Sequence, residues 1–195
     1  AIKVVSRRGV PWVGLEVRSD NAVARTMYEE LGFREVGRTH HLMREGRRGR
    51  SAGHWHWDGM RRGGRRDADA LIRLMERVVP EEQRPLLEKT VDDYRPSWTR
   101  RMDYWLHCED EVWWVVPEGG TIRGAVRALH KSGGLPHRLE ALVAPTVERE
   151  LASALIRRGT AKLAGSERAI TSAVPNPREH VLEALRSEGF REVRV

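Results

Sequence analysis

The sequence predicts an α/β fold, and three observations lead to that prediction. Segments with helical periodicity alternate with short apolar runs that end at glycine or proline. Over residues 65–195 the expected order is helix, helix, three strands, helix, strand, helix, strand. The five residues GFREV also occur twice, at Gly32–Val36 and at Gly189–Val193, each time after a helix-like run. The copies are 157 residues apart, about the length of one domain, which indicates a repeated unit.

Length and composition limit the class of protein. The chain has 195 residues, of which 39% are hydrophobic, enough for one complete domain and part of another. No apolar run approaches the ~20 residues that a transmembrane helix needs, and the first residues lack a secretory signal pattern. We therefore expect a cytoplasmic protein with no membrane partner. Cys108 is the single cysteine, which excludes an internal disulfide.

The net charge of +7 comes mostly from arginine. Such a charge favours polyanionic partners, but it does not identify one. Two basic clusters, Arg44–Arg50 and Arg61–Arg66, contain the glycines typical of solvated turns. We do not expect nucleic acid to be a partner.

The first sixty residues predict a strand, a helix and a hairpin. The apolar run Val10–Val17 indicates a buried strand, and Asn21 or the residue before it can cap a helix that stops at Gly32. Phe33–Arg44 alternates well enough for a long strand, and residues 54–61 would return beside it. Because two glycines follow at 63 and 64, we place a domain boundary there, with domains at residues 1–62 and 65–195.

The second domain predicts a complete set of elements. A helix runs from about residue 67 to its proline stop at Pro80, and a more polar helix covers residues 81–94. Three strands are expected at residues 111–119, 121–130 and 137–145. An amphipathic helix at 146–165, a strand at 169–175 and a helix at 176–189 then lead into the second GFREV.

The segment VGLEVRSDNAVARTMYEELGFREVGR, residues 13–38, resembles the closing motif of the GNAT superfamily of acyl-CoA-dependent N-acyltransferases. In that motif a strand is followed by the pattern N..A..LYE.LGF and another strand. The matching positions are Leu15, Val17, Asn21, Ala22, Ala24, Tyr28, Glu29, Leu31, Gly32 and Phe33. The resemblance implies a GNAT-like mixed, mostly antiparallel sheet flanked by helices. It also implies a tandem protein, in which the C-terminal portion of one GNAT domain precedes a second, degenerate one.

The resemblance further implies an N-acetyltransferase that moves an acetyl group from acetyl-CoA to a primary amine. The acceptor would be a small molecule or a peptide. Tyr28 matches the tyrosine that protonates the departing CoA thiolate, a task that suits a phenol within hydrogen-bond reach. Asn21 and Ala24 match cofactor-side positions. The alternatives are that Tyr28 only packs on the sheet and that Asn21 only caps its helix.

The second domain departs from the GNAT pattern at the cofactor. In the family, the strand before the long helix separates from its neighbour, and a glycine-containing loop binds the pyrophosphate at the start of that helix. Here Val143 and Ala144 hold the cofactor-side positions, but no glycine follows before residue 153, and Glu148 would repel a pyrophosphate. Leu185 stands where the first copy has its tyrosine. We expect this domain to be non-catalytic.

Other polar residues are weaker candidates. Glu16 and Glu140, on expected strands, are possible general bases, with surface strand carboxylates as the alternative. His40 and His41 could meet the histidines at 54 and 56 if the hairpin forms, but no carboxylates or cysteines occur at ligand spacing, so no metal site is predicted.

A non-catalytic function is the alternative to the enzyme. In that hypothesis the chain is a scaffold or dimerisation module whose arginine-rich surface binds anions. A homodimer is a possible assembly, because a strand at the edge of the sheet needs cover.

Overall fold

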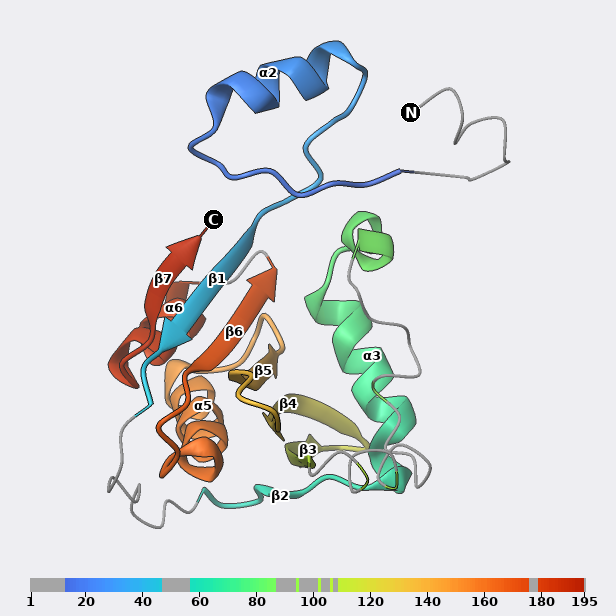
Figure 1. The fold of residues 1–195 in the computed structure, drawn as a ribbon. Helices are drawn as coiled ribbons and strands as arrows, with labels where there is room; N and C mark the ends of the chain where they lie inside the picture. Colours follow the sequence, from blue (N-terminus) through green and yellow to red (C-terminus); the bar gives the residue numbers. More distant parts are fainter. Residues whose placement is uncertain are drawn as a thin grey trace.

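A seven-stranded mixed sheet forms the centre of the protein (Figure 1). The computed structural model describes residues 13–46, 57–86, 94, 102, 106, 109–175 and 179–194. The strand order is β2-β3-β4-β5-β6-β1-β7, and every neighbouring pair is antiparallel except β5 with β6. This confirms the expected mixed, mostly antiparallel sheet. The strands are β1 (Thr39–Arg44), β2 (Arg61–Arg62), β3 (Asp110–Glu118), β4 (Thr121–His130), β5 (His137–Val143), β6 (Ile170–Pro175) and β7 (Arg191–Arg194).

Helices cover both faces of this sheet, as Figure 1 shows. On one side α5 (Arg149–Leu163) packs on β4 and against α6 (Glu179–Ser187), and on the other lies α3 (Ala68–Val78). Gly159 lets α5 approach closely, because a Cβ there would lie 2.6 Å from a methyl carbon of Val126. Two 3-10 helices, η1 (Arg65–Asp67) and η2 (Glu81–Leu86), flank α3. The predicted helix over residues 81–94 is thus 3-10 at its start, and most of its remainder lies outside the described residues.

Strand β1 does not form the predicted hairpin. It lies between β6 and β7 and is antiparallel to both, while Arg61–Arg62 pairs with β3 at the far edge of the sheet. The central side chain of β1, Leu42, is only 1% exposed, so the insertion buries apolar surface as well as satisfying both backbone edges. A strand from the predicted first domain therefore completes the sheet of the second. The boundary itself, between residues 62 and 65, stays a prediction.

Two other expected strands are wrong or shorter than predicted. Val13–Val17, the described part of the first apolar run, has no strand geometry and mostly exposed side chains. Residues 33–38 are also irregular, and β1 begins only at Thr39. A strand needs a hydrogen-bonded neighbour, and in the described part of the chain none lies beside these segments.

The repeat found in the sequence is also a structural repeat. Helix α2 (Ala22–Glu30) and helix α6 have nine residues each and are offset by the same 157 positions as the GFREV copies. Both end in the Schellman arrangement, with the following glycine at φ 87°. The four capping hydrogen bonds, at 2.9 to 3.1 Å, run from Gly32 N to Glu29 O, Phe33 N to Tyr28 O, Gly189 N to Arg186 O and Phe190 N to Leu185 O.

Strands β5 and β6 are joined only at their first residues. His137 pairs with Ile170 and Arg138 with Thr171, after which the two strands separate, as the resemblance implies. His137 is fully buried at this junction, where its Nδ1 accepts a hydrogen bond from the Lys131 amide at 3.1 Å. Burial, with smaller effects from neighbouring His130 and Arg168, lowers the pKa of His137 from 6.5 to about 4.

Replacing Leu42 tests whether β1 belongs to the folded core. We expect Leu42→Ala to lower the free energy of unfolding by about 2–5 kcal/mol, because it leaves a cavity in the hydrophobic core. Met43→Ala is the matched control, since the neighbouring side chain is 37% exposed and should cost clearly less. Urea unfolding followed by circular dichroism measures both. Equal losses would mean that β1 is not an integral strand.

The buried histidine makes stability depend on pH. Below pH 6.5 the unfolded chain takes up a proton at His137 that the folded chain refuses until about pH 4. The free energy of unfolding should therefore fall as the pH drops through this window, and it should fall less steeply in His137→Gln. Urea unfolding at half-unit pH steps compares the two slopes. Parallel slopes would show that His137 does not contribute.

Candidate functional site

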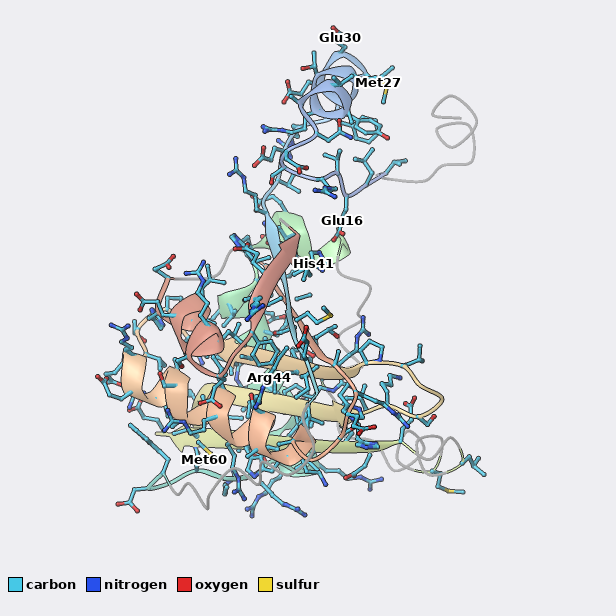
Figure 2. The ribbon with its side chains drawn as sticks, turned by 60° about the vertical axis from the view of Figure 1, so that its left-hand side comes forward. Glu16, Met27, Glu30, His41, Arg44 and Met60 are labelled. Carbon is cyan, nitrogen blue, oxygen red and sulfur yellow. The ribbon has the colours of Figure 1, made fainter. Side chains whose placement is uncertain are left out.

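The candidate site is a cleft beside α2. It has a volume of about 510 Å³ and lies between Val13–Val17, the inner side of α2 and the segment 33–41. Glu82 and Gln83 of η2 and Pro175 at the end of β6 also line it, so both halves of the chain contribute. In Figure 2 α2 lies away from the sheet, and Met27 and Glu30 are on the outer side of this helix. Glu16 lies beside His41 at the base of the cleft.

Tyr28 presents its phenol to this cleft. The side chain is half-buried, and its ring packs edge-on against Phe33 with the ring centroids 5.7 Å apart. Leu185, the equivalent residue in α6, is 0% exposed and packs in the core instead. The structure therefore places a polar ring in the first copy where the second copy has an apolar core residue.

The other inner positions of the two copies differ in the same way. Val13 is 43% exposed, whereas its repeat equivalent Ile170 is 3% exposed. Phe33 is half-buried and Phe190 is fully buried. The described residues of the first copy thus leave open a face that the second copy covers with its sheet and α5.

Asn21 caps α2. Its Oδ1 accepts a hydrogen bond from the Ala24 amide at 3.1 Å, and its side chain is otherwise exposed. This is the ordinary N-cap arrangement, which satisfies one of the free amides of the first turn. A role of Asn21 and Ala24 at a cofactor stays a prediction.

Charged side chains at the cleft are partly paired with one another. Glu35 accepts from Arg38 at 2.9 Å and lies 3.2 Å from Arg25. The hydrogen bond from Arg38 and the charges of both arginines lower the pKa of the Glu35 carboxyl. At the base of the cleft, Glu16 Oε2 lies 3.7 Å from His41 Nε2, which joins residues 13–17 to β1. The proposed base Glu16 therefore faces the same cleft as Tyr28.

Gln83 is a cleft residue that the sequence does not reveal. It is only 5% exposed, and its Nε2 donates to the Val36 carbonyl at 3.0 Å. Because that carbonyl can only accept, the contact fixes the orientation of the amide group. The Oε1 atom is buried and has no hydrogen-bond partner among the described residues. Gln83 lies in a polar run, EEQR, which carries no pattern that distinguishes it.

Another charged group lies at the start of α5. Glu148 is the N-cap residue, and its carboxylate accepts two hydrogen bonds from Arg123, at 2.6 and 2.8 Å. This pairing lowers the pKa of Glu148. Val143 and Ala144, at the end of β5, are buried, and the Ala144 amide donates to the Arg123 carbonyl. The cofactor role of Val143 and Ala144 stays a prediction. At the start of α5, where a pyrophosphate would bind, the Glu148 carboxylate is paired with Arg123.

Glu140 lies in a nearly buried polar cluster on β5. It accepts from the Tyr94 hydroxyl at 3.0 Å and lies 3.5 Å from the Arg127 guanidinium. Arg127 also lies 2.6 Å from Glu111 on β3 and 5.5 Å from the Trp113 ring centroid. Glu140 is thus not a surface carboxylate. Its pairing to a buried arginine and the hydrogen bond from Tyr94 hold it in place.

The histidines of β1 point to separate carboxylates. His40 contacts Glu192 on β7 through Nδ1, and His41 approaches Glu16. The histidines at 54 and 56 lie outside the described residues, as does Cys108. Within the described ranges, no three histidine, cysteine, aspartate or glutamate side chains gather as metal ligands would. Nor does any described helix have the length and apolar character needed to cross a membrane.

Comparison with known proteins gives a fold. No family model matches the sequence, and no curated protein matches it significantly. A GCN5-related N-acetyltransferase from Sphaerobacter thermophilus has a TM-score of 0.55 and 18% identity over 91% of this chain and 55% of its own. A tandem GNAT protein from the clavulanic acid biosynthesis pathway has a TM-score of 0.51 and 11% identity over 95% of this chain and 58% of its own.

A third solved structure agrees with these two. It is a GCN5-related N-acetyltransferase from Anabaena variabilis, with a TM-score of 0.51 and 10% identity over 98% of this chain and 45% of its own. The chain therefore spans between 45% and 58% of the length of these three proteins. At identities of 18% or less the likeness concerns the backbone arrangement. On the evidence of its sheet order, the separation of β5 from β6 and these superpositions, the chain has the fold of the GNAT acetyltransferases.

Proposed function

We propose that this chain is part of a GNAT-type N-acetyltransferase, which transfers an acetyl group from acetyl-CoA to a primary amine. The reaction would take place in the unit to which α2 belongs, with Tyr28 as the general acid. The GNAT fold supports the reaction class. The cleft beside α2 supports the location, because it combines a phenol with a wall of apolar side chains.

The observation that carries the proposal is the difference between Tyr28 and Leu185. The repeat gives both residues the same place on the same kind of helix, and the second copy fills that place with a fully buried leucine. Tyr28 is instead half-buried in the lining of the cleft, where a bound molecule can contact it. This favours a chemical role for Tyr28 over simple packing.

Acetyl-CoA supplies an activated acetyl group as a thioester. The described residues fit its reactive end, since Tyr28 is half-buried in the lining of the cleft and its phenol can act there as a proton donor. In this proposal the hydroxyl donates its proton to the sulfur that departs when the amine takes the acetyl group. Asn21 and Ala24, at the start of the same helix, would lie on the cofactor side.

Tyr28→Phe tests the proposed general acid in the full-length protein that contains this chain. The variant keeps the ring and its contact with Phe33 but removes the proton donor. We expect kcat to fall about 100-fold or more, with little change in the KM for acetyl-CoA. Release of free thiol, measured with a panel of primary amines, gives both constants.

Tyr94→Phe is the matched control. It removes a phenol hydroxyl from the second domain, where it contacts Glu140, and should reduce stability more than turnover. If Tyr94→Phe stopped turnover and Tyr28→Phe did not, the reaction would belong to the second domain and the proposal would be wrong.

A second function is proposed for the domain at residues 65–195, namely that it is a non-catalytic support for the first. Two observations favour it: Glu148 and Arg123 pair at the start of α5, and Leu185 replaces the proton donor. The carboxylate makes no capping hydrogen bond to the helix amides, but it places a negative charge at the positive end of the helix, where it would repel a pyrophosphate.

Acetyl-CoA titration followed by amide NMR shifts tests this second function. We expect the amides of residues 146–152 to remain unshifted at millimolar acetyl-CoA, because Glu148 repels the phosphates. Glu148→Gly in the same titration shows whether the carboxylate is the obstacle. A saturable shift of these amides in the unchanged chain would mean that the second domain binds the cofactor after all.

A further inference from the structure

We propose that Glu82 and Gln83 of η2 bind a cationic amino group of the acceptor, so that the second domain selects the substrate of the first. The acceptor would carry two amino groups. One would react beside Tyr28 as the neutral amine, and the other would be held as an ammonium at the η2 side of the cleft. This inference rests on the proposed function and names the substrate class of the same site.

Gln83 has a buried amide oxygen, Oε1, with no hydrogen-bond partner among the described residues. The contact of its Nε2 with the Val36 carbonyl commits the amide to one orientation and leaves Oε1 as an unused acceptor. Burying an acceptor without a partner is costly, and a native structure keeps such a group where a ligand or water satisfies it. Because Gln83 lines the cleft, an N–H donor inside the cleft is the partner that fits.

Carboxylates also line the cleft to which Gln83 contributes. Glu82 lines the cleft next to Gln83 and forms no ion pair with the described residues. Glu16 lies at the base of the cleft beside His41 (Figure 2). The Glu82 carboxylate and the Gln83 amide oxygen together form a pair of acceptors suited to an ammonium group.

The cleft is large enough to hold a whole small molecule. A volume of about 510 Å³ lies within the range of sites that hold whole small molecules, and it exceeds what a single small amine would fill. Tyr28 comes from α2, whereas Glu82 and Gln83 come from η2 in the other half of the chain. A flexible chain with an amino group at each end would contact both sets of residues at once.

The test uses this 195-residue chain and isothermal titration calorimetry, with no acetyl-CoA present. The probe is 1,5-diaminopentane, compared with pentan-1-amine and glutarate. We expect the diamine to bind saturably with one molecule per chain, the monoamine to bind more weakly, and glutarate not to bind. Glu82→Gln and Gln83→Met should each lower the affinity for the diamine about tenfold or more. Each variant weakens or removes an acceptor for a charged donor.

Glu30→Gln is the matched control. It removes the same charge as Glu82→Gln, from an exposed position on α2 that does not line the cleft, and it should leave the affinity unchanged (Figure 2). Circular dichroism shows whether each variant is folded. If Gln83→Met does not fold, Glu82→Gln still tests the inference. Absence of saturable diamine binding, equal binding of glutarate, or an equal effect of Glu30→Gln would each overturn the inference.

The outcome is separable from the proposed function. Diamine binding without acetyl transfer in the full-length protein would keep the ammonium site at Glu82 and Gln83 but reject the enzyme and, with it, the role of this site in selecting an acceptor. Acetyl transfer that depends on Tyr28, with no change of the amine KM in Glu82→Gln, would keep the enzyme and reject the role of η2.

Discussion

The double pairing of β1 holds the two parts of the chain together. Thr39–Arg44 forms backbone hydrogen bonds with β6 on one side and β7 on the other, and Leu42 is buried at its centre. An inner strand of this kind cannot leave without exposing two rows of backbone groups. The strand follows directly from residues 33–38, which line the cleft, and Gln83 of η2 donates a hydrogen bond to Val36 in this segment.

The same backbone plan supports two chemical environments. At the start of α5 the Glu148 carboxylate is paired with Arg123 from β4, so the two opposite charges at this position satisfy each other. Beside α2, by contrast, the buried amide oxygen of Gln83 has no hydrogen-bond partner among the described residues. A satisfied polar group is typical of structure and an unsatisfied one of binding, which supports the different functions proposed for the two halves.

Most of the described helices and strands after residue 65 could be predicted from the sequence, because they carry clear local patterns. The 3.6-residue periodicity of α5 and the turn glycines between β3 and β4 act over a few residues only. The place of β1 could not be predicted in this way. Its pairing with β6 joins residues more than 120 positions apart, and no local pattern specifies a long-range partner.

The misplaced strand and the missed polar contacts both depend on tertiary structure, which a local sequence pattern does not specify. Val13–Val17 has the composition of a buried strand, but a strand forms only beside a neighbour that the described chain does not supply. Gln83 and the Tyr94–Glu140 contact depend on tertiary burial of polar side chains, which polar sequence runs do not announce. By contrast, the motif around Tyr28 was recognisable, since its residues lie close together in the sequence.

The two helix caps form a built-in comparison between local and global opening. Gly32 and Gly189 have the same φ and the same hydrogen-bond pattern, yet one follows a helix with no buried residue and the other a helix in the core. Amide exchange with solvent at the first cap needs only fraying of a single exposed helix, whereas at the second it needs the sheet and α5 to come apart. The five residues GFREV therefore specify the shape of a chain reversal, while its lifetime is set by whatever packs against it.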